Sequence, residues 1–136
     1  MTSLEQLREL GLGGFAEFLG LELLTASPDE VVATWAARPD LHQPYGLLHG
    51  GAHCAVVETL ASIGGMLWFA DRGQVVGVSN TTDFFRAVRE GTLTSRALPV
   101  RRGRLQQLWD VETTDEEHRL VARGSVRLQN LTDRSG

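Results

Sequence analysis

The sequence lacks lysine and has a single cysteine, and both shortages restrict its chemistry. All 13 basic residues are arginine. Because every cation is a guanidinium, each can make planar two-point contacts with a phosphate or a carboxylate. Cys54 alone allows no internal disulfide and no thiolate metal cluster within one chain.

Long apolar runs and an excess of positive charge are also missing. The first residues have no basic start followed by an apolar run, so no signal peptide is expected. The longest apolar stretch, residues 55–70, is interrupted by Glu58 and Ser62 and is predicted to fall short of a membrane span. The net charge of −4 disfavours nucleic acid and anionic membranes as partners. We therefore expect a cytoplasmic protein with neither kind of partner.

Length and periodicity predict one domain with an α+β fold. The chain has 136 residues, of which 42% are hydrophobic and 22% charged, as in a single globular domain. We expect residues 1–136 to form that domain, with a core at about 21–128 and a helical N-terminal segment at 1–20. Strands are predicted at 21–26, 31–36, 74–84, 91–100, 105–113 and 120–128, and a long buried helix at about 50–71. This order predicts a mostly antiparallel sheet wrapped around one long central helix.

The start and the middle of that helix carry the residues best suited to chemistry. Gly50 and Gly51 open the helix, where first-turn N–H groups without intrahelical partners can polarise a carbonyl oxygen. Glu58 stands alone in an apolar interior, where an ionised carboxylate is costly unless it is paired or used. Ser62 follows one turn later on the same face and can position a water molecule. Structural roles stay open as alternatives. The glycines can serve tight packing, and Glu58 can form an ion pair.

Metal and thiol chemistry are not expected from these residues. His49 and His53 have the four-residue spacing of zinc ligands on a helix. However, Glu58 lies about 140° around the helix from His53. Gly50 also stands where a zinc protease has its catalytic glutamate. Cys54 has no activating neighbour in the sequence.

Helix geometry predicts that a site using both Gly50 and Glu58 lies between two subunits. Their eight-residue separation corresponds to about 12 Å of helix rise. A reacting carbonyl must lie within about 3 Å of both its oxyanion donor and the attacking group. One helix cannot supply both, whereas two antiparallel copies in a symmetric dimer can.

A cluster of arginines forms a second candidate site. Six of them fall within 19 residues that contain a single acid, Glu90. The turn at 101–104 between two strands can add backbone N–H groups for an anion. The cluster is either a solvated charged turn or a site for the phosphates of a nucleotide-bearing substrate. Its members are Arg86, Arg89, Arg96, Arg101, Arg102 and Arg104.

The pattern Gln43…His49-Gly50-Gly51…Glu58…Ser62 resembles the hotdog-fold acyl-CoA thioesterases. The likeness is closest to the phenylacetic-acid-degradation type and to the 4-hydroxybenzoyl-CoA thioesterases that use a helix glutamate. It extends over residues 21–128, and the run at 43–51 is its most specific part. Segments 76–84 and 101–104 also resemble that family.

The resemblance implies a role for each matching residue. Glu58 would be the nucleophile or general base, and the Gly50 N–H would polarise the thioester carbonyl. Gln43 and His49 would orient that carbonyl, and Ser62 would hold water. The pantetheine arm and phosphates would meet Gly51, Asn80, Thr81, Arg101, Arg102 and Arg104. The resemblance further implies a homodimer that pairs into a homotetramer, and no cofactor apart from the coenzyme A of the substrate.

The sequence therefore predicts hydrolysis of an aromatic or short- to medium-chain acyl-CoA to the free acid and coenzyme A. Two alternatives stay open. A hotdog dehydratase or hydratase would also act on acyl thioesters, although the His-Phe-Pro-Gly and Asp-x-Asn-Pro-x-His signatures are absent. A non-catalytic acyl-CoA-binding module is disfavoured by the presence of both Gln43 and Glu58. Release of free thiol from an acyl-CoA distinguishes a thioesterase from both alternatives.

Overall fold

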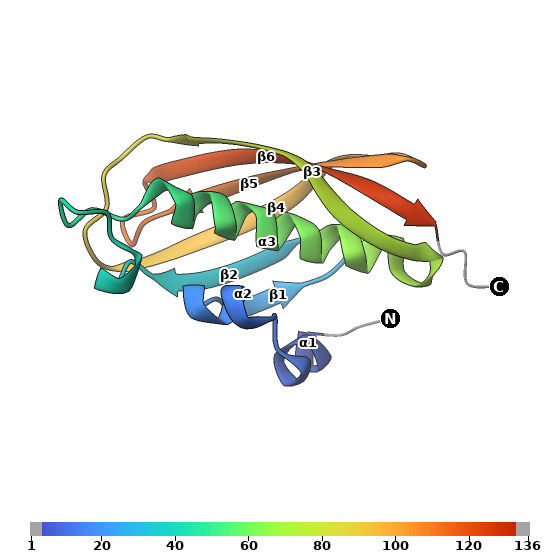
Figure 1. Cartoon of the computed structure of the whole chain (residues 1–136), viewed down its shortest axis with the longest axis horizontal. Coiled ribbons are helices and arrows are strands. Elements are labelled where there is room, and N and C mark those ends of the chain that lie inside the picture. Colours follow the sequence, from blue (N-terminus) through green and yellow to red (C-terminus); the bar gives the residue numbers. More distant parts are fainter. Residues whose placement is uncertain (1–3, 133–136) are drawn as a thin grey trace.

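A computed structural model describes residues 4–132 and shows an antiparallel sheet curled around one long helix (Figure 1). The helical elements are α1 (Leu4–Leu10), α2 (Gly14–Leu19), η1 (Pro39–Leu41), α3 (Gly50–Phe69) and η2 (Ala70–Arg72). The strands are β1 (Glu22–Ala26), β2 (Val31–Ala36), β3 (Gly73–Phe84), β4 (Thr92–Arg102), β5 (Gln106–Thr114) and β6 (Leu120–Thr132). Their order across the sheet is β1-β2-β4-β5-β6-β3. The predicted α+β arrangement is confirmed.

Helix α3 is apolar on nearly all sides because the sheet surrounds it. It contacts β2, β3, β4, β5 and β6. Two adjacent glycines allow the closest approach. A Cβ on Gly64 would lie 2.5 Å from the ring of the fully buried Trp109, and one on Gly65 would overlap the side chain of Leu128. Backbone and sheet therefore approach more closely here than any side chain would permit.

The apolar stretch was predicted to be too short for a membrane span, but the helical stretch that contains it is not too short. Gly50–Arg72 is long and apolar enough to cross a membrane by length and composition alone. However, 61% of its most apolar window is buried inside the chain. A helix enclosed by its own sheet has this composition without needing lipid.

The element ends differ slightly from prediction, and β6 differs most. This strand continues to Thr132 rather than ending near residue 128. The predicted strand ended where the apolar pattern ends, but Asn130 is buried and its N–H donates to the carbonyl of Leu105. A buried polar side chain with hydrogen-bond partners can thus extend a strand beyond its apolar pattern.

The two edges of the sheet differ in how they are protected. Strand β1 is short and contacts α1, from which Arg8 donates to the Leu23 carbonyl. Strand β3 spans 12 residues and carries the exposed apolar side chains of Val76 and Val78. A long apolar edge is a template for pairing with another strand.

Candidate active site

The loop before α3 is held in a compact turn. The Gln43 N–H donates to the Leu47 carbonyl at 2.7 Å, and the Gly46 N–H donates to the Gln43 carbonyl at 3.0 Å. Gly46 has φ +78°, a conformation that favours glycine. The side-chain oxygen of Gln43 accepts from the Tyr45 N–H. This bond leaves the amide NH₂ of Gln43 without a partner among the described residues.

The N-terminus of α3 offers one free backbone donor. His49 is the N-cap, and its Nδ1 accepts from the Gly51 N–H at 2.7 Å. The Ala52 N–H donates to the His49 carbonyl at 3.0 Å. The Gly50 N–H, at the first helical position, has no acceptor within residues 4–132. It is therefore available to a carbonyl oxygen at the positive end of the helix dipole.

An aromatic ring from the end of β3 lies directly over Gly50. A Cβ at this glycine would be 2.6 Å from Cε2 of Phe84. The Phe84 side chain is 52% exposed and also stacks on the His53 imidazole, with ring centroids 5.6 Å apart. The free N–H of Gly50 thus has an apolar surface beside it, where an acyl group can pack.

Glu58 is half-buried in the middle of α3 and faces strand β3. Its Oε1 accepts a hydrogen bond of 3.1 Å from the amide of Asn80, which also donates to the Cys54 carbonyl at 3.0 Å. The Asn80 oxygen accepts from the Thr82 hydroxyl at 2.7 Å. A Cβ at Gly77 would overlap Oε2 of Glu58. Asn80 therefore orients the carboxylate, while Gly77 makes the space for it.

The remaining predicted helix residue, Ser62, is half-buried one turn beyond Glu58. Residues four apart on a helix lie on the same face, so its hydroxyl is near the carboxylate side of α3. Gly50 and Glu58 belong to the same straight element, and about 12 Å of helix rise separates them. Within one chain the donor and the carboxylate do not converge.

His53 lies between these two groups on α3 and is almost completely buried. It is 3% exposed, it meets the Trp35 ring edge-on at 5.7 Å, and its Nδ1 has no hydrogen-bond partner. Burial lowers the pKa of His53 from 6.5 to about 4. The imidazole is therefore neutral at pH 7. It supports Phe84 through ring stacking and not through charge.

The buried imidazole predicts a loss of stability in mild acid. The unfolded chain protonates this group near pH 6.5, whereas the folded chain does so only near pH 4. The part of the free energy of unfolding that depends on neutral His53 is therefore fully present above pH 6.5. It is lost as the pH falls from 6.5 to about 4. The loss is about 3 kcal/mol by linkage. Urea titrations across this range should give a steeper pH dependence for wild type than for His53→Phe. Equal slopes would contradict the buried neutral state.

The predicted substrate-binding residues separate into four places. Gly51 is at the helix N-terminus and Asn80 is beside Glu58, as described above. Thr81 follows Asn80 on β3, so its side chain points to the opposite face of the sheet. The Arg102 guanidinium donates to the Pro28 carbonyl and to Asp29, and lies over Trp68.

The arginine cluster is likewise divided between partners. Arg96 pairs with Glu30 at 3.2 Å, and Arg89 donates to the Tyr45 carbonyl at 3.5 Å. Arg101 and Arg104 lie at a hollow on the outer face of the sheet. The arginines are close in sequence, but they do not form a single basic patch. Neighbouring residues of a strand point to opposite faces of the sheet and therefore contact different partners.

Two residues of the site were missed by sequence reasoning. Gly77 makes space for the carboxylate, and a glycine inside a strand pattern is a known signal of close approach. His53 was considered only as a metal ligand, and its burial between two rings has no signal in one sequence. Within residues 4–132, no three His, Cys, Asp or Glu side chains are grouped closely enough to hold a metal ion.

Comparison with known proteins relates this chain to enzymes that cleave thioesters. The model of the thioesterase superfamily matches residues 45–122. The crystal structure of S. sahachiroi AziG is 57% identical, covers 90% of this chain and 100% of AziG, and has a TM-score of 0.89. The crystal structure of thioesterase HI1161 from Haemophilus influenzae is 30% identical in sequence and has a TM-score of 0.91. The match covers 100% of this chain and 96% of the HI1161 chain. The 1,4-dihydroxy-2-naphthoyl-CoA hydrolase of Escherichia coli K12 is 33% identical over 87% of each chain.

Proposed function

Because the chain belongs to the thioesterase superfamily and has its hotdog fold, we propose that this thioester hydrolase acts on acyl-CoA, releasing the free acid and coenzyme A. The observation that carries the proposal is the half-buried Glu58 carboxylate, held by Asn80 in a helix that is otherwise apolar. No arginine pairs with Glu58 among the described residues, so its carboxylate is not part of a structural ion pair. A carboxylate kept there without a counter-charge is suited to chemistry.

The reaction needs a polarised carbonyl and an attacking oxygen. The Gly50 N–H would bind the thioester oxygen as negative charge develops on it, with Gln43 and His49 orienting the carbonyl. Glu58 would attack the thioester carbon itself or deprotonate a water molecule held by Ser62. In the first route, the C–S bond breaks to give a mixed anhydride, which water then hydrolyses. In both routes the sulfur leaves as the thiol of coenzyme A.

The two halves of the site would come from two subunits. The separation of Gly50 from Glu58 along α3 requires a second copy, and the free edge of β3 provides a surface for it. Pairing of β3 with its symmetry mate would cover Val76 and Val78. The helix glutamate of one subunit would then face the helix N-terminus of its partner. We propose a homodimer on this basis, and a homotetramer by likeness to the family.

The substrate class follows from the surface beside the donor. Phe84 presents an exposed ring next to Gly50, and such a ring favours an aromatic acyl group through offset stacking. The name of the Escherichia coli relative also specifies an aromatic acyl-CoA. We therefore propose an aromatic acyl-CoA as the preferred substrate.

Thiol release across a panel of substrates tests the proposal. Benzoyl-CoA, butyryl-CoA and palmitoyl-CoA are compared at equal concentration, with p-nitrophenyl acetate as the oxygen-ester control. We expect steady release of coenzyme A with the highest kcat/KM for benzoyl-CoA. Binding of all three without turnover would instead favour a non-catalytic module.

A further inference from the structure

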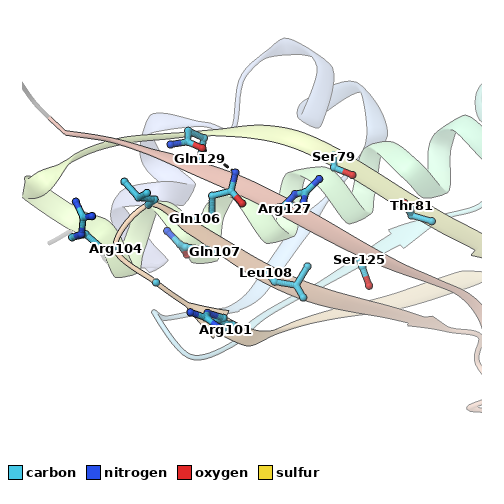
Figure 2. A pocket seen from close by; sticks show the side chains of 12 residues that line it. Ser79, Thr81, Arg101, Arg104, Gln106, Gln107, Leu108, Ser125, Arg127 and Gln129 are labelled. Carbon is cyan, nitrogen blue, oxygen red and sulfur yellow. Dashed lines mark hydrogen bonds between the residues drawn. The ribbon is translucent and has the colours of Figure 1, made fainter.

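Strand β3 brings an aromatic side chain to the face of the sheet that contacts α3. Alternation sends Ser79 and Thr81 to a hollow on the outer face (Figure 2), whereas Asn80 points to the helix and donates to its backbone. By the same alternation, Phe84 at the end of the strand faces α3, and its ring lies over Gly50. The ring beside the proposed carbonyl donor therefore comes from a strand and not from the helix that carries the donor.

Pairing of the strand fixes the backbone of Phe84 but leaves its ring half-exposed. Phe84 is opposite Ala122 in the ladder of β3 and β6, and the next N–H, of Phe85, donates to the Val121 carbonyl at 2.8 Å. On the buried side the imidazole of His53 stacks on the Phe84 ring, with centroids 5.6 Å apart and an interplanar angle of 27°. A half-exposed ring keeps one orientation only if a neighbour holds it there. His53 is that neighbour.

The imidazole is itself anchored to the core of the sheet. His53 is almost completely buried, and the ring of Trp35 meets it edge-on at 5.7 Å. Trp35 Nε1 donates to Ser95 Oγ at 3.0 Å, and the hydroxyls of Ser95 and Thr113 share a hydrogen bond of 2.7 Å. All of these side chains are buried. A continuous chain of contacts thus leads from the middle of the sheet through His53 to Phe84.

Space filling alone does not account for an imidazole at this position. Nδ1 of His53 is buried without a hydrogen-bond partner, and an unpaired buried polar atom destabilises a fold. An aliphatic side chain would fill a similar volume without that penalty. The imidazole offers a flat surface instead, and both of its centroid distances are in the range of about 4.5–7 Å that aromatic pairs adopt. The observed contacts therefore use the planarity of His53.

We propose that His53 is a positioning residue that sets acyl selectivity by holding the Phe84 ring in one orientation beside the Gly50 N–H. The inference rests on the proposed function, since it takes this N–H as the donor to the thioester carbonyl. A fixed ring stacks on a planar acyl group, whereas a ring that rotates freely must first be ordered and gives a planar group little advantage over a flexible chain. Because His53 is buried, it acts on specificity through Phe84 and not on the reacting atoms.

The ratio of kcat/KM for benzoyl-CoA to kcat/KM for butyryl-CoA tests the inference. His53→Leu and His53→Met remove the flat ring and keep an apolar side chain, and methionine adapts to irregular gaps. Each should lower the ratio between about 3- and 10-fold, as expected for the loss of one aromatic contact. His53→Phe retains a ring and should keep the ratio within a factor of about two. The matched control, His118→Asn, removes an exposed imidazole from the turn between β5 and β6 and should leave the ratio unchanged.

A double-variant cycle shows whether His53 acts through Phe84. Phe84→Leu should lower the ratio by itself, and the addition of His53→Leu should lower it no further. A further fall would show that His53 acts elsewhere and would overturn the inference. A merely structural role would lower kcat/KM equally for both substrates. Leucine and methionine variants that are folded by urea unfolding and keep the wild-type ratio would therefore also overturn it, as would a wild type that does not prefer benzoyl-CoA.

Binding of analogues that cannot be hydrolysed separates this inference from the proposed function. In phenacyl-CoA and 2-oxopentyl-CoA a methylene group stands between the sulfur and the carbonyl, so neither contains a thioester. Titration calorimetry should show a wild-type preference for phenacyl-CoA that His53→Leu loses and His53→Phe keeps. If this pattern is found but wild type releases no thiol from any acyl-CoA, selectivity is set as proposed and only the proposed hydrolysis is wrong. Thiol release with unchanged selectivity in His53→Leu would show the reverse.

Discussion

Glu58→Gln is expected to lower kcat for thioester hydrolysis by between about 10²- and 10⁴-fold, the contribution of a positioned acid–base group. The substitution keeps the shape of the side chain, and its amide oxygen can still accept from Asn80. The half-buried position and the fold are therefore retained, and only the negative charge is lost. Thiol release under saturating acyl-CoA measures kcat, and circular dichroism with urea unfolding verifies the fold.

A matched control removes the charge of a carboxylate that lies outside the proposed active site. Glu112→Gln neutralises an exposed glutamate on β5, on the outer face of the sheet. Its kcat should equal that of wild type within a factor of about two, since surface changes of this kind have small effects. A Glu58→Gln enzyme that keeps more than a tenth of wild-type kcat would remove Glu58 from the reaction.

Gly77→Ala is expected to inactivate the enzyme without unfolding it. The new methyl group would occupy the place of Oε2 of Glu58. The carboxylate is the flexible end of a long side chain, so it moves and the strand stays. Because a misplacement of about 1 Å costs roughly 10²-fold in rate, we expect a fall of at least that size in kcat. Stability should change by less than about 1 kcal/mol.

Two further variants distinguish displacement of the carboxylate from a general effect of alanine. Gly14→Ala is the control, since nothing lies within 4 Å of a Cβ there, and it should retain full activity. Glu58→Asp shortens the side chain by one methylene and withdraws the carboxylate from Gly77. The Gly77→Ala/Glu58→Asp double variant should therefore be no less active than Glu58→Asp alone. Additive losses in this cycle would show that the two residues are not coupled.

The layout of the fold was predictable because its signals are local. Continuous apolar character from Gly50 predicts a buried helix of the observed length, and alternation predicts the strands around it. The turn between β1 and β2 also has a local signal, since Ser27 Oγ accepts there from the N–H groups of Asp29 and Glu30. The order of strands across the sheet could not be read, because pairing between distant segments leaves no local mark.

The details of the site depend on a feature that the sequence does not mark. The register of β3 against β6 shifts between Gly77 and Ser79, so Val78 is the extra residue of a bulge. A shift of one residue exchanges the two faces of a strand. This bulge is what directs Asn80 to Glu58 and sends Thr81 to the outer hollow. A lone carboxylate in an apolar helix, by contrast, is visible in the sequence, so Glu58 could be selected as a candidate. Gly77 was missed, and Asn80 was expected to meet the substrate and not to orient the carboxylate.

The central claim is that Glu58 of one subunit acts on a carbonyl held by the Gly50 N–H of the other. Proline is tolerated at the first position of a helix, so Gly50→Pro removes the donor and keeps the start of α3, while its ring displaces the side chain of Phe84. We propose mixing Glu58→Gln and Gly50→Pro subunits in equal amounts after reversible dissociation and measuring thiol release. Each mixed dimer would contain one intact site, so random pairing predicts recovery of about a quarter of wild-type activity. Folded mixed dimers that remain as inactive as either parent would contradict the shared site.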